Sequence, residues 1–192
     1  MKKKTITTVL VIMLLTFSVF AAAIIGTLTY WYSDGSSIGY WTTARKINLN
    51  ADSSASTTAA QNAATQWTNA GISSSWVASG QNIVMFSYPY ATCVQLNSSI
   101  STEDAGFTVT YQSYVGDFDY NSTYKRGYEI VLANVYVITD ASTNFIGGSA
   151  HELGHAFGWQ GHSSNSSDVM YPYNNTPTTL TTRDKNQLNQ VY

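Results

Sequence analysis

All three histidines of the chain lie in one twelve-residue segment, HELGHAFGWQGH, which runs from His151 to His162. On an α-helix, residues four apart lie on the same face about one turn apart, so His151 and His155 can offer imidazole nitrogens to one metal ion. Glu152 follows His151 directly and projects beside that face, near enough to hold a metal-bound water without binding the metal itself. Glu152 therefore has the position of a general base.

A catalytic zinc ion takes three protein ligands and leaves its fourth position to water, so the histidine pair needs a third partner. Gly158 can adopt the left-handed conformation that ends a helix, after which the chain turns back and brings His162 toward the same ion. Zinc lowers the pKa of its water to about 7 and polarises a substrate carbonyl. The register of the three histidines favours this site over the alternative of helix histidines without metal.

The elements around this segment follow from hydrophobic periodicity. Ala60, Ala63, Ala64 and Trp67 recur at helical spacing, with Ser56 as an N-cap and Gly71 as a stop. Residues 45–50 alternate in character and predict a first strand, and segments rich in Val, Ile, Tyr and Phe predict strands at 83–88, 107–114 and 128–138. A second helix is expected over residues 144–157 and a third from 182 to the end. Strands with one helix among them and two helices after them predict an α+β domain.

The composition is typical of one globular domain that does not bind nucleic acid. The chain has 192 residues, of which 44% are hydrophobic and only 10% are charged, so it can bury a core of its own with few ion pairs. Its formal charge is −2; without Lys2, Lys3 and Lys4, six basic residues remain against eleven acidic ones, a balance of −5. Binding to nucleic acid needs the opposite charge. Cys93 is the only cysteine, which excludes an intrachain disulfide and a cysteine-ligated zinc site.

The N-terminus has the order of an export signal. Three lysines precede an uncharged stretch from Thr5 to Ser33, which is most apolar over residues 9–25 and holds small residues at 21–23. We expect residues 1–26 to be a signal peptide or an uncleaved signal anchor, and residues 27–44 a linker; a buried core helix is the less favoured alternative. Cleavage gives a secreted protein. An anchor with an aromatic belt at residues 30–32 leaves the domain outside the membrane.

HELGHAFGWQGH followed by Met170 in SSDVMYP resembles the metzincin clan of zinc endopeptidases, whose pattern is HExxHxxGxxH with a Met-turn, and is most similar to the matrixins. The resemblance implies a twisted, mostly parallel sheet with an active-site helix, a packing helix and a C-terminal helix after the Met-turn. It also implies one catalytic domain over residues 45–192, with an upper part over 45–162 and a lower part over 163–192.

Further residues take roles from the same resemblance. Met170 lies eight residues after His162, and in the family this methionine forms an apolar floor beneath the zinc without binding it. The segment of Tyr171, Pro172 and Tyr173 resembles the wall of the pocket for the residue after the scissile bond. An aspartate at the position of Asp184 ties the C-terminal helix to the Met-turn.

Three features depart from the matrixin pattern. Three residues rather than two separate Gly158 from His162, and Asp168 is the alternative third ligand. No histidine is left for the second, structural zinc of animal matrixins, so we expect a single zinc ion. The latency cysteine of the family lies in a propeptide, and no segment before Arg45 is long enough to be one; Cys93 is expected to be a buried small hydrophobe.

Asp117 and Asp119, in GDFDYN, can offer oxygens to calcium or act as turn formers, and turn formers are the commoner case. The sequence therefore supports a calcium site less than it supports the zinc site.

These features predict an extracellular, monomeric zinc-dependent endopeptidase that acts on proteins or peptides. Glu152 would take a proton from the zinc-activated water as it attacks the carbonyl and pass that proton to the leaving amine. One alternative is a surface-displayed, non-catalytic binding protein that retains a zinc site, although a closed structural site has no use for the base Glu152. Another is an enzyme of the same motif that acts on a non-peptide amide, which would not require the likeness at Met170.

Overall fold

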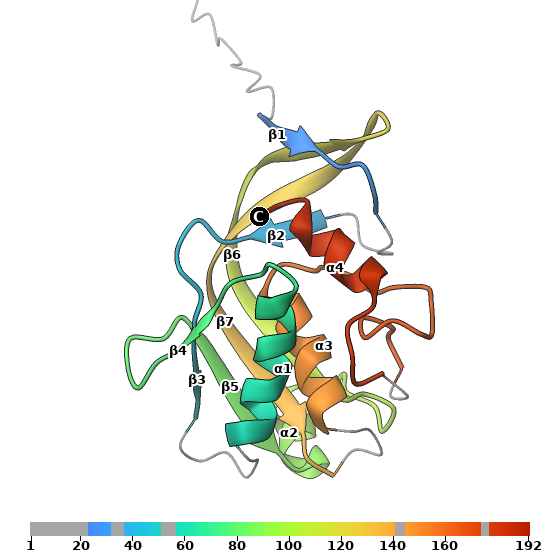
Figure 1. Cartoon of the computed structure of the whole chain (residues 1–192). Helices are drawn as coiled ribbons and strands as arrows, with labels where there is room; N and C mark the ends of the chain where they lie inside the picture. Colours follow the sequence, from blue (N-terminus) through green and yellow to red (C-terminus); the bar gives the residue numbers. More distant parts are fainter. Residues whose placement is uncertain (1–22, 32–36, 51–56, 141–144, 174–176) are drawn as a thin grey trace, which may run out of the picture.

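A computed structural model gives the structure of the chain and describes residues 23–31, 37–50, 57–140, 145–173 and 177–192. Runs of two or three strands are each followed by a helix, and a last helix closes the chain, which confirms the α+β class (Figure 1). The strands are β1 (Ile24–Thr27), β2 (Ser37–Tyr40), β3 (Lys46–Leu49), β4 (Ser75–Trp76), β5 (Ile83–Tyr88), β6 (Gly106–Tyr120) and β7 (Thr123–Ile138). The helices are α1 (Thr57–Asn69), α2 (Tyr90–Leu96), α3 (Phe145–Ala156) and α4 (Thr182–Asn189).

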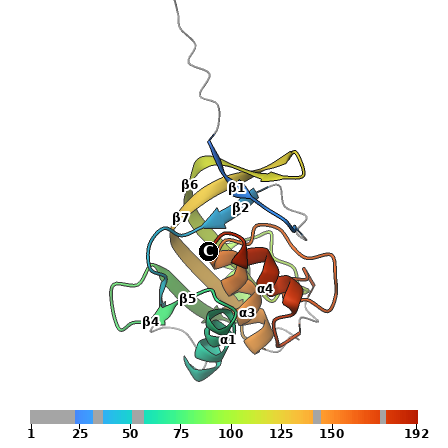
Figure 2. The same cartoon turned by 45° about the horizontal axis from the view of Figure 1, so that its top comes forward.

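The strands form one seven-stranded sheet in the order β1-β6-β7-β5-β3-β4, with β2 paired to β7 beside this path. Among the described strands, the pairing of β6 with β7 is antiparallel and the others are parallel. The mostly parallel sheet that the resemblance implied is therefore confirmed. The sheet curls, and α1 and α3 lie side by side on one of its faces (Figures 1 and 2).

Helix α1 is the packing helix that the sequence predicted. Its stripe of Ala60, Ala63, Ala64 and Trp67 is buried, because these four side chains face α3 and the sheet. Trp67 Nε1 donates a hydrogen bond to the carbonyl oxygen of Ala150 in α3, at 2.8 Å. The predicted end of the helix at Gly71 is confirmed, since α1 ends at Asn69 and Gly71 has a φ of 99°. The predicted N-cap residue, Ser56, lies outside the described residues.

The lower part of the chain shares the main core with the upper part. Val169, Met170, Leu180 and Leu188 are buried in the same hydrophobic cluster as the residues of α1, α3 and the sheet. Among the described residues, 163–192 therefore share one hydrophobic core with the upper part.

The hairpin of β6 and β7 is longer than the predicted strands at 107–114 and 128–138. Both strands continue to a two-residue turn at Asn121 and Ser122, whose φ values are 49° and 62°. A tight hairpin turn of this kind needs left-handed backbone at both central residues, and asparagine tolerates that region better than most side chains. Asp117 and Asp119 thus lie in β6, before the two turn residues. From the strand, Asp119 supports the turn, because its Oδ1 accepts a hydrogen bond from Ser122 N at 3.0 Å.

Residues 23–31, which we call the N-terminal strap, pack onto this hairpin. Strand β1 runs parallel to β6, and the Leu28 amide donates to the carbonyl oxygen of Asp119 at 2.7 Å. Leu28 and Trp31 are buried in a second small core with Ile38 and Phe118.

Two glycines of the hairpin fit the strap. A Cβ at Gly116 would lie 2.3 Å from the carbonyl oxygen of Ala23, and one at Gly127 would lie 2.5 Å from Ile25 Cδ1. The residues from 23 to 27 are therefore part of the packed domain.

The predicted leader and linker differ from the structure where they overlap it. The strap covers the end of the predicted leader, and Ser37–Tyr40, within the predicted linker, is strand β2 of the sheet. Small and β-branched residues there pack on β7, although the Gly and Ser content is typical of a linker. No helix in the described part of the chain is long and apolar enough to cross a membrane, and residues 1–22 lie outside that part.

Two helices differ from the sequence expectation. Helix α2 was not predicted; it follows Pro89, which serves as its N-cap residue. Helix α4 ends at Asn189 instead of continuing to the end, because the next side chains bind elsewhere. Asn189 Nδ2 donates to Ala70 O at 2.8 Å, and Gln190 Oε1 accepts from the strap amides of Thr29 and Tyr30 at 2.7 and 2.9 Å.

Candidate metal centre and active site

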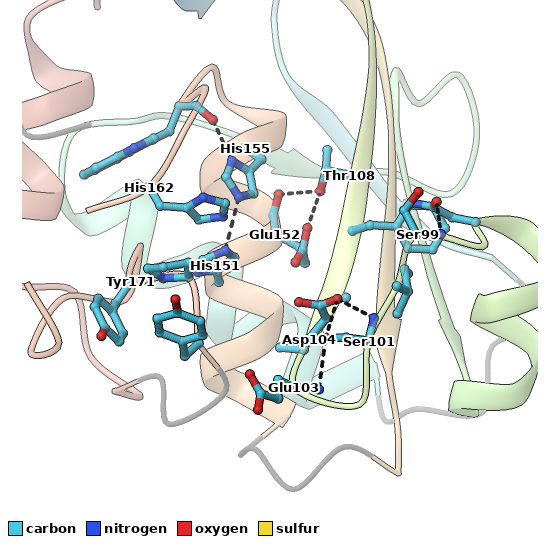
Figure 3. A pocket seen from close by; sticks show the side chains of 18 of the residues that line it. Ser99, Ser101, Glu103, Asp104, Thr108, His151, Glu152, His155, His162 and Tyr171 are labelled. Atoms are coloured by element: carbon cyan, nitrogen blue, oxygen red, sulfur yellow. Dashed lines mark hydrogen bonds between the residues drawn. The ribbon is translucent and has the colours of Figure 1, made fainter. Parts of the chain in front are cut away.

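Helix α3 carries three of the four predicted site residues in its last two turns. The helix forms despite Gly147, Gly148 and Gly154 because it is buried on nearly every side, so packing overrides the low helix propensity of glycine. His151 and Glu152 are buried and His155 is partly exposed at the pocket (Figure 3). The sequence expectation of a helix over 144–157 is confirmed for 145–156, and Asn144 lies outside the described residues.

A tight turn after α3 brings the third histidine back. Gly158 and Gly161 have φ values of 123° and 101°, a region that glycine enters without steric cost. Strand β2 supports the turn, since Gly39 N donates to the carbonyl oxygen of Gly158 at 2.8 Å. The ring centroid of His162 then lies 5.3 Å from that of His151 and 5.0 Å from that of His155. The extra residue between Gly158 and His162 is thus accommodated.

Backbone carbonyl groups orient the two helix histidines. His151 Nδ1 lies 2.7 Å from the carbonyl oxygen of Val169, and His155 Nδ1 lies 2.6 Å from that of Trp159. Because a carbonyl only accepts hydrogen bonds, each Nδ1 carries the proton and each Nε2 carries a lone pair. Burial lowers the pKa of His151 to about 4 and that of His155 well below its ordinary value, so both rings are neutral.

The donor set fits a zinc ion. The two Nε2 atoms lie 3.1 Å apart, and two lone pairs at that distance repel each other unless a cation lies between them. The ligand atoms of His151, His155 and His162 all lie within 4.8 Å of one another. Three histidines, of which His151 and His155 are each oriented by a hydrogen bond at Nδ1, are a usual ligand set for catalytic zinc. Within the described residues no other group of three metal-binding side chains occurs.

Glu152 lies beside the histidines with its carboxyl group held by strand β6. The Thr108 hydroxyl lies 2.8 Å from Glu152 Oε2 and 2.9 Å from the carbonyl oxygen of the same residue (Figure 3). Burial raises the pKa of Glu152 to about 8, although the hydrogen bond from Thr108 acts in the opposite direction. Sequence reasoning missed Thr108, because strand alternation does not tell which side chain of β6 meets α3.

Met170, for which the resemblance implied a floor beneath the zinc, is buried in the main core and packs against α3. A Cβ at Gly154 would lie 2.3 Å from Met170 Sδ, so the glycine allows the methionine to pack directly against α3. The Asp184 carboxylate accepts hydrogen bonds from the amides of Val169 and Met170 at 3.0 and 3.2 Å. Asp184 therefore ties α4 to the Met-turn, and through Val169 it also fixes the carbonyl that orients His151.

Asp168, the alternative third ligand, is turned away from the histidines. Its Oδ1 forms an ion pair with Arg183 Nη2 at 2.8 Å, and its Oδ2 accepts from the Ser163 hydroxyl at 2.6 Å. Burial alone would raise the pKa of Asp168, but the hydrogen bonds from Arg183, Ser163 and Thr181 outweigh it and lower the pKa. Asp168 thus supports the turn after His162, and His162 is the third histidine of the cluster.

The other residues singled out in the sequence lie apart from this site. Cys93 is buried in a small cluster with Ile100 and Ile138, as expected of a small hydrophobe. Asp117 and Asp119 are not part of a metal-binding group among the described residues, and Asp119 acts as a turn former. Calcium binding is not supported by these contacts.

A pocket of about 510 Å³ opens beside the histidines, between β6, α3 and the segment after Met170. Its volume lies in the usual range for ligand sites. Tyr171 and Tyr173 stand on one wall with their ring centroids 5.2 Å apart, and the loop before β6 forms the opposite end. The acidic residues Glu103 and Asp104 of that loop also line the pocket, and sequence reasoning missed both, since nothing in the sequence places the loop there.

The model of the matrixin family matches residues 41–192. The chain belongs to the matrixin family. This family consists of zinc metallopeptidases, which agrees with the three converging histidines of this matrixin. The match begins after β2, so the strap and β2 of this matrixin precede the matched region. No match was found among curated proteins.

Proposed function

We propose that this matrixin is an extracellular zinc-dependent endopeptidase that hydrolyses peptide bonds with an activated water molecule. One observation carries the proposal: three histidines converge beside the buried carboxyl group of Glu152 at the wall of an open pocket. A structural zinc site closes its fourth position with a protein ligand. Among the described residues no fourth histidine, thiolate or carboxylate joins the three histidines, which supports a catalytic site.

The site residues have separate roles in the proposed reaction: the histidines bind the metal, Glu152 transfers the proton and Thr108 orients Glu152. When bound, zinc supplies a Lewis acid that polarises the substrate carbonyl and lowers the pKa of water. His151, His155 and His162 hold the ion in the pocket. The Glu152 carboxylate takes a proton from the attacking water and delivers it to the nitrogen of the leaving amine. The Thr108 hydroxyl holds Oε2 of Glu152 and so fixes the direction of this transfer.

The ionisation of Glu152 depends on its neighbours. In the buried site its pKa is raised to about 8, and a positive charge nearby favours the ionised carboxylate. The base form is therefore favoured when the histidines hold a cation. A base with a pKa near the working pH transfers protons efficiently in both directions.

We propose that the N-terminal segment exports the protein, which works outside the cell as a monomer, either secreted or anchored. Cleavage, where it occurs, lies upstream of Ala23, because the Ala23 carbonyl and the Ile25 side chain fit against Gly116 and Gly127. Mass spectrometry of the exported protein checks the position. A mature chain that begins after Ala23 would contradict the proposed position.

The decisive experiment replaces the proposed base and keeps the proposed ligands. Glu152→Gln should bind one zinc ion per chain and lose at least about 10³-fold in the rate of casein or peptide cleavage, since no group remains to move the proton. Glu129→Gln is the matched control, because Glu129 lies on β7 outside the pocket and accepts from the Thr42 hydroxyl. Zinc is measured by atomic absorption, and cleavage by mass spectrometry.

The same experiment separates the alternatives. A chelator should abolish cleavage by the parent protein, and added zinc should restore it. If the parent binds zinc but cuts no peptide, the non-catalytic binding protein is the better description. If Glu152→Gln cuts as fast as the parent, Glu152 is not the base.

A further inference from the structure

The pocket beside the histidines is negatively charged at the end formed by the loop before β6. Glu103 and Asp104 line this end, and Glu152 lines the middle. Figure 3 shows Glu103 and Asp104 projecting from the loop into the space between β6 and α3. Among the described residues that line the pocket, none is lysine or arginine. Carboxylates at this end of the pocket favour a positively charged ligand group there.

The loop holds the Asp104 carboxyl group in place. Asp104 Oδ2 accepts from the Ser101 amide at 2.7 Å, and Ser101 O accepts from the Asp104 amide at 3.2 Å. The next residue, Ala105, is buried; its carbonyl accepts from the Ile138 amide at 2.9 Å, and a Cβ at Gly148 of α3 would lie 3.1 Å from Ala105 Cβ. The Asp104 carboxyl group is therefore fixed relative to the helix that carries the histidines, and Glu103 stands exposed beside it.

Asp104 lines the same pocket as His151 and Glu152, so its carboxyl group borders the space that a substrate side chain would enter. A cationic side chain placed there gains from the negative charges of Asp104 and Glu103.

The wall opposite the loop also suits a cation. Tyr171 and Tyr173 present aromatic rings to the pocket, and Pro172 lies between them in the sequence. Aromatic faces attract ammonium and guanidinium groups, and the methylene stems of lysine and arginine pack on apolar surface such as Phe107 and Pro172. The pocket thus offers a place for both the stem and the charged end.

We propose that this pocket binds a lysine or arginine side chain of the substrate, next to the scissile bond, and that Glu103 and Asp104 determine this specificity. The inference rests on the proposed endopeptidase function and names its substrate class: peptides with a basic residue within two positions of the cut. A neutral side chain in that place removes water from the carboxylates without supplying a charged hydrogen-bond donor, which costs binding energy.

The test is a digest of a random peptide library by the zinc-loaded protein, with cleavage sites read by mass spectrometry. Lysine and arginine should be enriched at one position within two residues of the cut. Two peptides that differ only there, with lysine or norleucine, then give a ratio of kcat/KM values. This ratio should fall about threefold in Glu103→Gln, whose carboxylate is exposed, and about tenfold in Asp104→Asn. Added salt should lower it in the parent.

Asp117→Asn is the matched control, because it removes one negative charge from β6 outside the pocket, and its ratio should equal that of the parent. Thermal unfolding checks that each variant is folded. Cleavage of the library without enrichment of basic residues overturns the specificity and leaves the endopeptidase function standing. An enrichment that survives both substitutions and high salt also overturns it. No cleavage at all by the zinc-loaded parent overturns the proposed function, and the specificity with it.

Discussion

The N-terminal strap contributes to stability through Leu28, and replacement of this residue by alanine measures the contribution. Leu28 is 1% exposed and packs with Trp31, Ile38 and Phe118 in the second core of the protein. Removing a buried leucine side chain costs about 2–5 kcal/mol, and the lower half of that range applies to a small cluster whose neighbours can relax. We therefore expect Leu28→Ala to lower the free energy of unfolding by about 2–3 kcal/mol.

The matched control is Ile24→Ala in the same strand. Ile24 is 55% exposed, and its backbone pairing with Asp117 does not depend on the side chain. An exposed substitution of this kind changes the free energy of unfolding by at most about 0.5 kcal/mol. Both variants are expressed from the full chain, and unfolding is measured on the purified exported protein.

The assay is thermal unfolding followed by circular dichroism at saturating zinc. For a domain of this size, 1 kcal/mol corresponds to about 2–4 °C, so Leu28→Ala should lower the Tm by about 4–12 °C and Ile24→Ala by less than about 2 °C. Equal unfolding temperatures for the two variants would show that the strap is not docked in solution, and the assignment of residues 23–31 to the domain would be wrong.

Three further predictions concern the core and the Met-turn. Gly154→Ala should lower the free energy of unfolding by about 1–3 kcal/mol, measured in urea, because its Cβ would meet Met170 Sδ at 2.3 Å. The lowered pKa of Asp168 means that its ion pair with Arg183 stabilises the protein above about pH 4 and is lost as the pH falls through the lowered pKa. Asp168→Asn should thus have a lower free energy of unfolding than the parent at pH 7. On acidification, that free energy should fall less in the variant than in the parent, as followed by thermal unfolding at each pH. Burial raises the pKa of Cys93 to about 11, so a thiol reagent should modify it at pH 8 only in the unfolded protein.

The site could be predicted from the sequence because its ligands are close along the chain. His151 and His155 share a helix face whatever the tertiary fold, and glycine at 158 and 161 allows His162 to return. Local spacing also predicted helix α1, because its four apolar residues form one stripe along the helix. Spacing alone determines such contacts, so a single sequence contains enough information.

Contacts between distant segments could not be predicted in this way. Thr108 meets Glu152 across 44 residues, and Gln190 meets the strap across 160. Nothing local marks either side chain, because a threonine in a strand and a glutamine near the C-terminus are common on any surface. The pairing of the strap with the hairpin was not predicted either, since an apolar stretch rich in small residues is typical of both an export signal and an edge strand.

Strand β2 explains how this matrixin accommodates an extra residue before its third histidine. The inserted turn needs a fixed backbone, and β2 supplies it: a Cβ at Gly158 would lie 2.0 Å from the carbonyl oxygen of Gly39, so the two glycines are in direct backbone contact. Beside them Ile38 forms a bridge with Trp159, whose carbonyl oxygen orients His155. The geometry of the histidine cluster thus depends on a strand that lies before the matched family region, in a stretch whose composition is typical of a linker.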